Sequence, residues 1–211
     1  MEHEYSIVGG LNRARIGHTI GGIAAAASSI IVTAFLALVK LAQTLGLAKN
    51  VPSLILWPVT AGAVYAFLYW LFDRRVWKLS YVAKLLRVPD LSGTWSCVGQ
   101  AINPDGSLGS AWTAEIVIVQ SWDRVRIRLK TAQSASNSVT AAIVYDEADG
   151  YRLMYNYKNE PNIDQVDLSA HRGFAELTFD RNLESAVGEY FNGHGRFTYG
   201  TMKLTRGGGH G

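Results

Sequence analysis

The 211-residue chain contains one cysteine, Cys97, and none of the short motifs that mark catalytic or phosphate-binding sites. A single thiol excludes an internal disulfide framework and a cysteine-based zinc site. The sequence has no glycine-rich phosphate loop, no HExxH motif and no nucleophile elbow, and its five histidines are scattered. The formal net charge of +3 is too small to indicate binding to a DNA or RNA polymer. We therefore expect no enzyme, with no catalytic residue, no metal site and no cofactor.

Charged residues are also missing from two long apolar segments, residues 19–39 and 51–72. Each segment reaches the roughly 20 residues that a helix needs to cross the hydrocarbon core of a bilayer. A cleaved signal peptide fits the first segment poorly, because its apolar stretch is long, begins late and is followed by a second one. We predict two transmembrane helices, and the lack of intramembrane charge gives no sign of an ion path.

Basic residues flank these segments asymmetrically. Two arginines precede the first segment and five basic residues follow the second, whereas only Lys40 and Lys49 lie between them. The positive-inside rule then predicts a two-pass membrane protein with both termini in the cytoplasm. Residues 73–87 repeat apolar side chains at helical spacing, so we expect the second helix to continue as a basic juxtamembrane helix that stops at Pro89.

Small residues recur at intervals of four in the first predicted span, at Gly21, Ala25 and Ser29. A stripe of small side chains lets two helices approach closely in lipid. The stripe fits self-association of several copies, and it fits equally well packing against the second helix of the same chain.

From Leu91 onward the dominant period is two, with turn residues at even intervals. We predict eight strands, at residues 92–99, 112–120, 123–131, 138–145, 150–158, 167–179, 185–191 and 196–206. Consecutive antiparallel strands with short links close most simply into an up-and-down barrel, and a sandwich is the alternative. The predicted organisation is membrane-anchored all-β: two helices with the juxtamembrane helix in residues 1–88, a cytosolic barrel in residues 89–206 and a disordered tail in residues 207–211.

The two ends of such a barrel are expected to differ. The first strand begins, and the eighth strand ends, at the same rim, which must face the membrane because the second helix leads into it. Gly93-Thr94-Trp95 resembles the start of lipocalin-type barrels, and this likeness implies that Trp95 closes that end with Arg206 packed on it. A ligand would then enter at the opposite, cytosolic end.

Aromatic and basic residues gather near that opposite end. The expected ligand-binding residues are Arg128, Tyr155, Tyr157, Tyr190, Asn192 and Arg196. Bases stack on tyrosine rings and arginine matches phosphate geometry, so this lining suits a small anionic ligand that contains a base. Core packing of the tyrosines is the alternative. The arginines of residues 123–131 fit an outward as well as an inward orientation, because a register shift of one residue reverses the two faces.

The whole arrangement resembles a known family. A two-helix hairpin, a basic juxtamembrane segment, the sequence "LSGTWSC" and the closing "GEYFNGHGRFTYGTMKLTR" are similar to the 2TM, β-strand-rich effectors of bacterial cyclic-oligonucleotide antiphage systems (CBASS). The resemblance implies a receptor for a cyclic dinucleotide made by a partner synthase. It also implies homo-oligomerisation through the membrane helices, disruption of the inner membrane and death or arrest of the infected cell.

Two other functions fit the same pattern. A membrane-tethered lipocalin-like carrier would hold an apolar ligand in a lining of Leu, Val and Phe. A scaffold subunit of a membrane complex would have a filled barrel and bind partners through its outer face.

Overall fold

The structure is a computed structural model that describes residues 1–46, 61–193 and 197–207. Its residues form two compact units, which we treat separately. One unit is helical and spans Leu11–Trp77. The other joins Met1–Gly10 to Lys78–Gly211 and contains all of the described strands.

The helical unit consists of α1 (Arg13–Thr44) packed against α2 (Ala61–Arg74). Asn12 caps α1, because its side-chain oxygen accepts a hydrogen bond of 2.8 Å from the backbone N–H of Ala14. Within the described residues, α1 is the one helix long and apolar enough to cross a membrane. The second predicted span, residues 51–72, begins outside the described residues, and α2 contains its second half.

The juxtamembrane segment is not the continuous helix that the periodicity predicts. The α-helix ends at Arg74, a 3₁₀ turn follows at Val76–Lys78, and a separate helix α3 spans Ser80–Leu86. Leu79 has an extended backbone between the last two elements, and Arg87 ends α3 in the left-handed conformation. The indole of Trp77 donates to the backbone oxygen of Asp73 at 2.8 Å, which satisfies a carbonyl at the end of α2.

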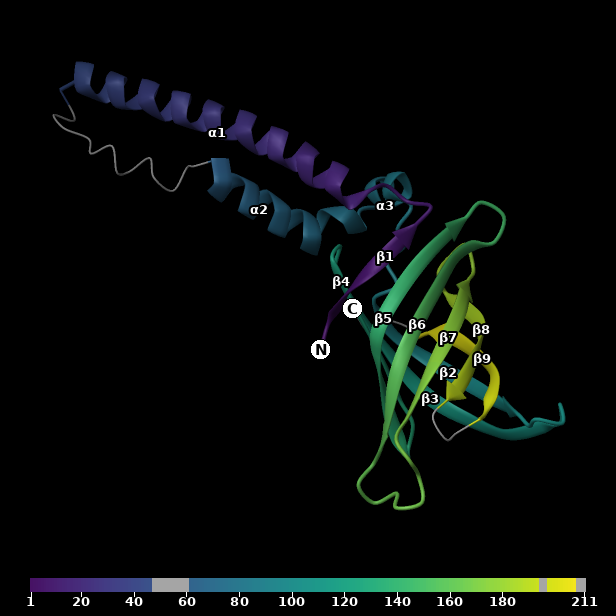
Figure 1. Ribbon diagram of the computed structural model, residues 1–211. Coiled ribbons are helices and arrows are strands. Elements are labelled where there is room, and N and C mark those ends of the chain that lie inside the picture. The colour runs from purple at the N-terminus through teal and green to yellow at the C-terminus, as the bar shows by residue number, and fades with distance from the viewer. Residues whose placement is uncertain (47–60, 194–196, 208–211) are drawn as a thin grey trace. The chain divides into compact units, whose positions relative to one another are not determined.

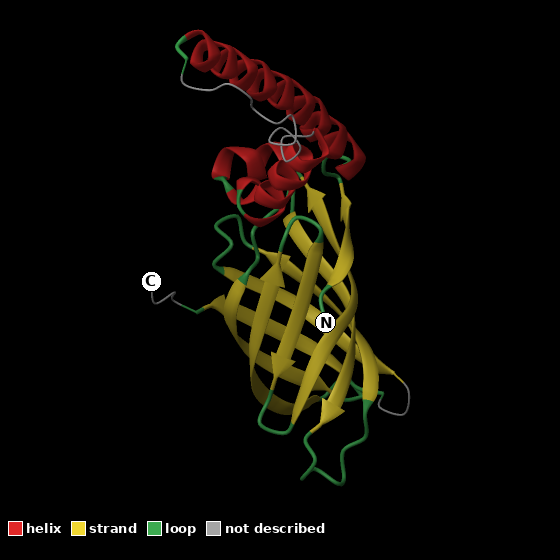
Figure 2. Cartoon of the chain, turned by 90° about the vertical axis from the view of Figure 1, so that its left-hand side faces the viewer, coloured by secondary structure: helices red, strands yellow, loops and turns green. Residues whose placement is uncertain are grey.

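The strand-rich unit is a closed barrel, shown in Figures 1 and 2. Its strands are β1 (His3–Val8), β2 (Gly93–Ile102), β3 (Leu108–Gln120), β4 (Arg124–Lys130), β5 (Ser134–Asp146), β6 (Gly150–Pro161), β7 (His171–Phe179), β8 (Ser185–Gly193) and β9 (Tyr199–Arg206). Strands β2 to β9 pair in chain order and β9 pairs with β2, as an up-and-down barrel requires. The eight strands predicted from the sequence are therefore present, with ends displaced by a few residues.

The ninth strand, β1, corrects the predicted count of eight. Strands β4 and β5 pair directly only where Arg128–Lys130 of β4 meets residues 135–137 of β5. Toward the start of β4 the two strands diverge, and β1 fills the gap between them. Residues 3–4 pair antiparallel with β4, and residues 5–8 pair parallel with β5. Tyr5 faces the core and is 4% exposed, and its hydroxyl donates to the backbone oxygen of Ser121 at 3.3 Å.

The barrel is solid at the end where β2 begins and β9 finishes. Large apolar side chains fill this half, among them Trp95, Ile116, Ile118, Leu177 and Phe179. The ring of Phe179 meets the indole of Trp95 edge-on at a centroid distance of 5.3 Å. A barrel of this size has just enough interior for such side chains, so this half has a packed core.

Candidate ligand-binding site in the barrel

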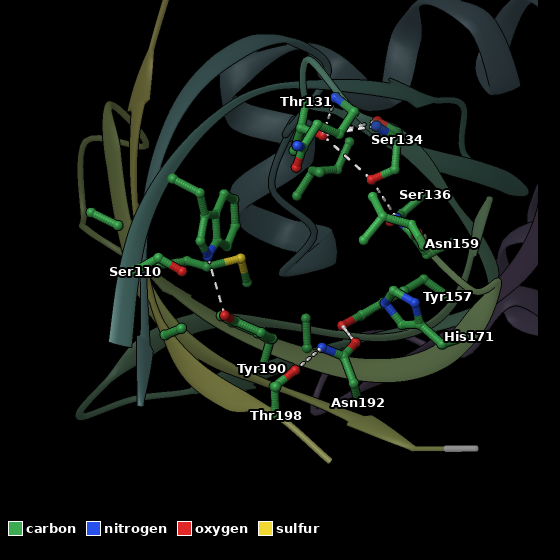
Figure 3. Close-up of a pocket in the computed structure, with 18 of the residues that line it drawn as sticks. Ser110, Thr131, Ser134, Ser136, Tyr157, Asn159, His171, Tyr190, Asn192 and Thr198 are labelled. Carbon is green, nitrogen blue, oxygen red and sulfur yellow. Dashed lines mark hydrogen bonds between the residues drawn. The ribbon is translucent and has the colours of Figure 1, made fainter. Parts of the chain in front are cut away.

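The other half of the barrel is hollow. A cavity of about 420 Å³ opens at the end where β2 finishes, opposite Trp95 and Arg206. This volume lies within the roughly 300–1,000 Å³ typical of small-molecule sites. Figure 3 shows the side chains that surround it.

One wall of the cavity is aromatic. The indole nitrogen of Trp112, on β3, donates to the hydroxyl of Tyr190, on β8, at 3.1 Å, and the two rings meet edge-on at 5.6 Å. Tyr155 and Tyr157 follow one another on the inner face of β6, with ring centroids 6.0 Å apart. Burial raises the pKa of Tyr155, so its hydroxyl stays protonated and available for hydrogen bonding at physiological pH.

Amide and hydroxyl groups line the part of the cavity that adjoins Tyr157 on β5 and β6. The side-chain nitrogen of Asn159, on β6, donates to the hydroxyls of Ser134 and Ser136, on β5, at 3.0 and 2.9 Å. Asn159 and Ser136 are both buried, and Figure 3 shows the three groups side by side. His171, at the start of β7, is also buried at the cavity, with its Nδ1 atom 3.2 Å from the backbone oxygen of Ser169.

A chain of hydrogen bonds runs along the rim (Figure 3). The hydroxyl of Tyr157 donates to the side-chain oxygen of Asn192 at 2.8 Å, and the side-chain nitrogen of Asn192 donates to the hydroxyl of Thr198 at 2.8 Å. Tyr157 and Asn192 therefore hold each other in fixed orientations toward the cavity.

The cavity brings together four of the six expected ligand residues. Tyr155, Tyr157, Tyr190 and Asn192 all contribute to its lining. Arg196 lies outside the described residues.

Arg128 is a correction. Its side chain is exposed on the outer face of the barrel, because Ile127 and Leu129, its neighbours on β4, face the cavity instead. The alternation along β4 thus places the arginines of this strand on the outer face, and Arg128 does not line the cavity.

Several lining residues were missed in the sequence. Trp112, Ser136 and Asn159 all alternate in phase with inward-facing neighbours, so the period of two contained this signal. The sequence pattern does not single out Ser136 and Asn159, because polar residues near a predicted turn are usually solvated. In the barrel these two side chains are hydrogen-bonded to each other inside the wall.

Comparison with known proteins identifies the chain. Residues 86–206 match the family described as "Cap15, cyclic dinucleotide receptor domain", and residues 14–78 match "Cap15, TM helices". The CD-NTase-associated protein 15 of Yersinia aleksiciae is 43% identical over 204 residues, which cover 97% of either chain. The chain belongs to the Cap15 family. This confirms the resemblance to CBASS effectors, and the cavity lies within the residues that match the receptor domain of Cap15.

The closed end of this Cap15 receptor domain has its own polar contacts. The guanidinium carbon of Arg206 lies 5.0 Å from the centre of the Trp95 ring. The guanidinium also donates to the backbone oxygens of Leu183, Asp90 and Ser92 at 2.8–3.1 Å. Arg206 thereby joins the last strand to the segment that leads into β2.

The small residues of α1 divide between two faces. Gly21 lies toward α2, since a Cβ atom there would lie 3.9 Å from the ring of Tyr65. Ala25 and Ser29 are exposed, whereas Ala24 and Ser28 are buried within the helical unit. The helix therefore packs against α2 through a face adjacent to the predicted stripe, and two of the three stripe residues stay available for another contact.

The described residues contain no group of three or more His, Cys, Asp or Glu side chains placed to hold a metal ion.

Proposed function

We propose that this chain is a CBASS effector that binds a cyclic dinucleotide in the hollow half of its barrel and responds by assembling in the membrane. The observation that carries the proposal is the cavity itself, which lies inside a Cap15 receptor domain and joins an aromatic wall to a wall of amides and hydroxyls. Aromatic rings stack on bases, while amide and hydroxyl groups bond base edges, ribose and phosphate.

The composition of the cavity favours this ligand over the two alternatives. A carrier of an apolar ligand needs an apolar lining, but more than half of the lining residues of this cavity carry polar side-chain groups. A scaffold with a filled barrel would have no such cavity. The described lining contains no Asp, Glu, Lys or Arg side chain. We therefore propose that Arg196, which precedes the lining residue Thr198 by two positions in the sequence, neutralises the negative charge of the ligand phosphates.

Assembly follows from differential binding. If the ligand binds the assembled form about 3 kcal/mol more tightly than the resting form, the equilibrium moves by roughly a hundredfold. Ala25 and Ser29, which are exposed on α1, supply the contacts between copies in this account. The proposal also places the barrel and both termini in the cytoplasm. A partner synthase supplies the ligand, and the assembled copies disrupt the membrane.

Binding tests this function directly. We expect the full chain in detergent to bind at least one cyclic dinucleotide in calorimetry, and Tyr157→Phe to weaken that binding about fivefold to twentyfold. The substitution removes the hydroxyl that orients Asn192, and a hydrogen bond of this kind is worth roughly 1–2 kcal/mol.

Asn156→Ala is the matched control, because Asn156 is the neighbour of Tyr157 on β6 but is exposed on the outer face. Its affinity should equal that of the unmodified chain. Equal weakening by both substitutions, or no binding of any member of a complete panel of cyclic dinucleotides, contradicts the proposal.

A further inference from the structure

The aromatic side chains of the cavity lie opposite residues with little or no side chain. In the barrel register, each ring is paired across the strand with a glycine or an alanine. The pairs are Trp112 with Gly99, Tyr155 with Ala141 and Ala175, Tyr190 with Ala175 and Gly200, and Tyr157 with Gly173. Alternation of large and small residues lets a ring lie along the wall of a barrel instead of across its interior.

Gly99 shows this relation most clearly. A Cβ atom at Gly99 would lie 2.1 Å from two carbons of the Trp112 indole, far inside van der Waals contact. The backbone of Gly99 does not have a positive φ, so its conformation does not itself require glycine. The requirement comes from the indole, which occupies the space that a side chain at Gly99 would take.

The position of this indole also decides the shape of the aromatic wall. Trp112 reaches Tyr190 through the hydrogen bond of 3.1 Å and the edge-on contact. An indole displaced from Gly99 loses this partner and moves toward the cavity that it lines. Both consequences reduce the space left for a ligand and make the aromatic side chains less well ordered.

We propose that Gly99 is a positioning residue that keeps the Trp112 indole against the wall and so preserves the ligand space. The identity of the ligand rests on the proposed function. The packing of the Trp112 indole against Gly99 is a property of the ligand-free barrel. Gly99 touches no ligand in this account and acts only through Trp112.

The other glycines of the pattern are less suitable for a test. A Cβ atom at Gly173 would lie 2.5 Å from the backbone oxygen of Phe191, and one at Gly200 would lie 2.1 Å from the backbone oxygen of Gln100. Substitution at either position disturbs the strand pairing itself. At Gly99 the nearest atoms all belong to the Trp112 side chain, so the effect of a substitution passes through that side chain.

The test is a double-substitution cycle on the full chain in detergent, with Gly99→Ala, Trp112→Leu and the two combined. The readouts are the affinity for the cyclic dinucleotide that binds the unmodified chain and the thermal midpoint of the ligand-free barrel. We expect Gly99→Ala to lower the affinity at least tenfold and the midpoint by several degrees. In the Trp112→Leu background, the same substitution should change the affinity less than twofold and leave the midpoint unaltered.

Gly109→Ala is the control, because it also adds a methyl group to a strand but meets no aromatic ring, with its nearest atoms at 3.2–3.3 Å. Unchanged affinity in Gly99→Ala, or an equal loss of midpoint in both backgrounds, overturns the positioning role. If the unmodified chain binds no cyclic dinucleotide, the proposed function fails, and the midpoint cycle still decides whether Gly99 holds the indole.

Discussion

At the residue scale, the barrel differs along its length in which side chains face inward. Trp95, Phe179 and Leu177 fill the closed half, whereas small residues beside tyrosines and Trp112 leave the other half hollow. Cys97 lies between these halves on β2 and is 1% exposed. Its burial raises the pKa of the thiol to about 12, so almost no thiolate exists at pH 8.

We therefore expect Cys97 in the folded chain to react with iodoacetamide far more slowly than an exposed cysteine. Intact mass measured over time at pH 8 gives the rate, and Ser96→Cys in a Cys97→Ala background is the control, since Ser96 is exposed on the same strand. The control should be modified at least a hundredfold faster. Equal rates would show that the barrel interior is open to reagent and poorly packed.

At the element scale, β1 is the feature that joins the N-terminus to the barrel. Tyr5 is held in the core, and the side-chain nitrogen of Gln120 donates to its hydroxyl at 3.3 Å. Gln120 also accepts from the backbone N–H of Leu91 at 2.9 Å and donates to the backbone oxygen of Pro89 at 3.1 Å. A buried network thus ties β1 to the segment through which the chain re-enters the barrel.

Removal of a side chain from this network should lower the free energy of unfolding of the barrel. Tyr5→Ala removes a buried aromatic side chain, for which a loss of roughly 3–5 kcal/mol in the free energy of unfolding is expected. Ser6→Ala, on the exposed face of the same strand, should change it by less than about 0.5 kcal/mol. Denaturation of the barrel in the full chain measures both. Similar values for the two variants would show that β1 is dispensable, in which case a fragment that starts at residue 88 would fold as well as the whole chain.

Two neighbouring residues of α1, Ala24 and Ala25, allow a second comparison of a buried and an exposed position. Ala25→Leu changes an exposed residue and should prevent assembly and toxicity while leaving ligand affinity within twofold. Ala24→Leu changes a residue that is 1% exposed and should instead destabilise the packing of α1 on α2. Growth of expressing cells and crosslinking of the protein in membranes separate the two effects. If Ala25→Leu keeps its full toxicity, the exposed face of α1 that contains Ala25 does not mediate assembly.

Much of the architecture could be predicted from the sequence, because period-two alternation and turn residues are local signals. They gave the eight strands β2–β9 and the inward face of β6 with Tyr155 and Tyr157. The strand β1 was missed although Tyr5 and Ile7 alternate with polar neighbours, since six residues before an apolar helix are too short to predict a strand that pairs far away in sequence. The outward orientation of Arg128 depends on register, which the pairing with β3 and β5 decides.

At the scale of the whole molecule, the chain connects one receptor domain to membrane helices at two points. Residues 9–12 lead from β1 into α1, and residues 75–92 lead from α2 to β2. Both connections reach the barrel through the network of Tyr5, Gln120 and Leu91, at the end remote from the cavity. We propose that ligand in the cavity changes how the membrane helices of several copies associate.

Leakage from liposomes measures this coupling between ligand binding and the membrane helices. The full chain is reconstituted into dye-loaded vesicles of phosphatidylethanolamine and phosphatidylglycerol, and the cyclic dinucleotide that it binds is added. We expect dye release that requires the ligand, follows its binding curve, shifts to higher concentration in Tyr157→Phe and is lost in Ala25→Leu. Release that is equal with and without bound ligand, or saturated binding without any release, would contradict this coupling.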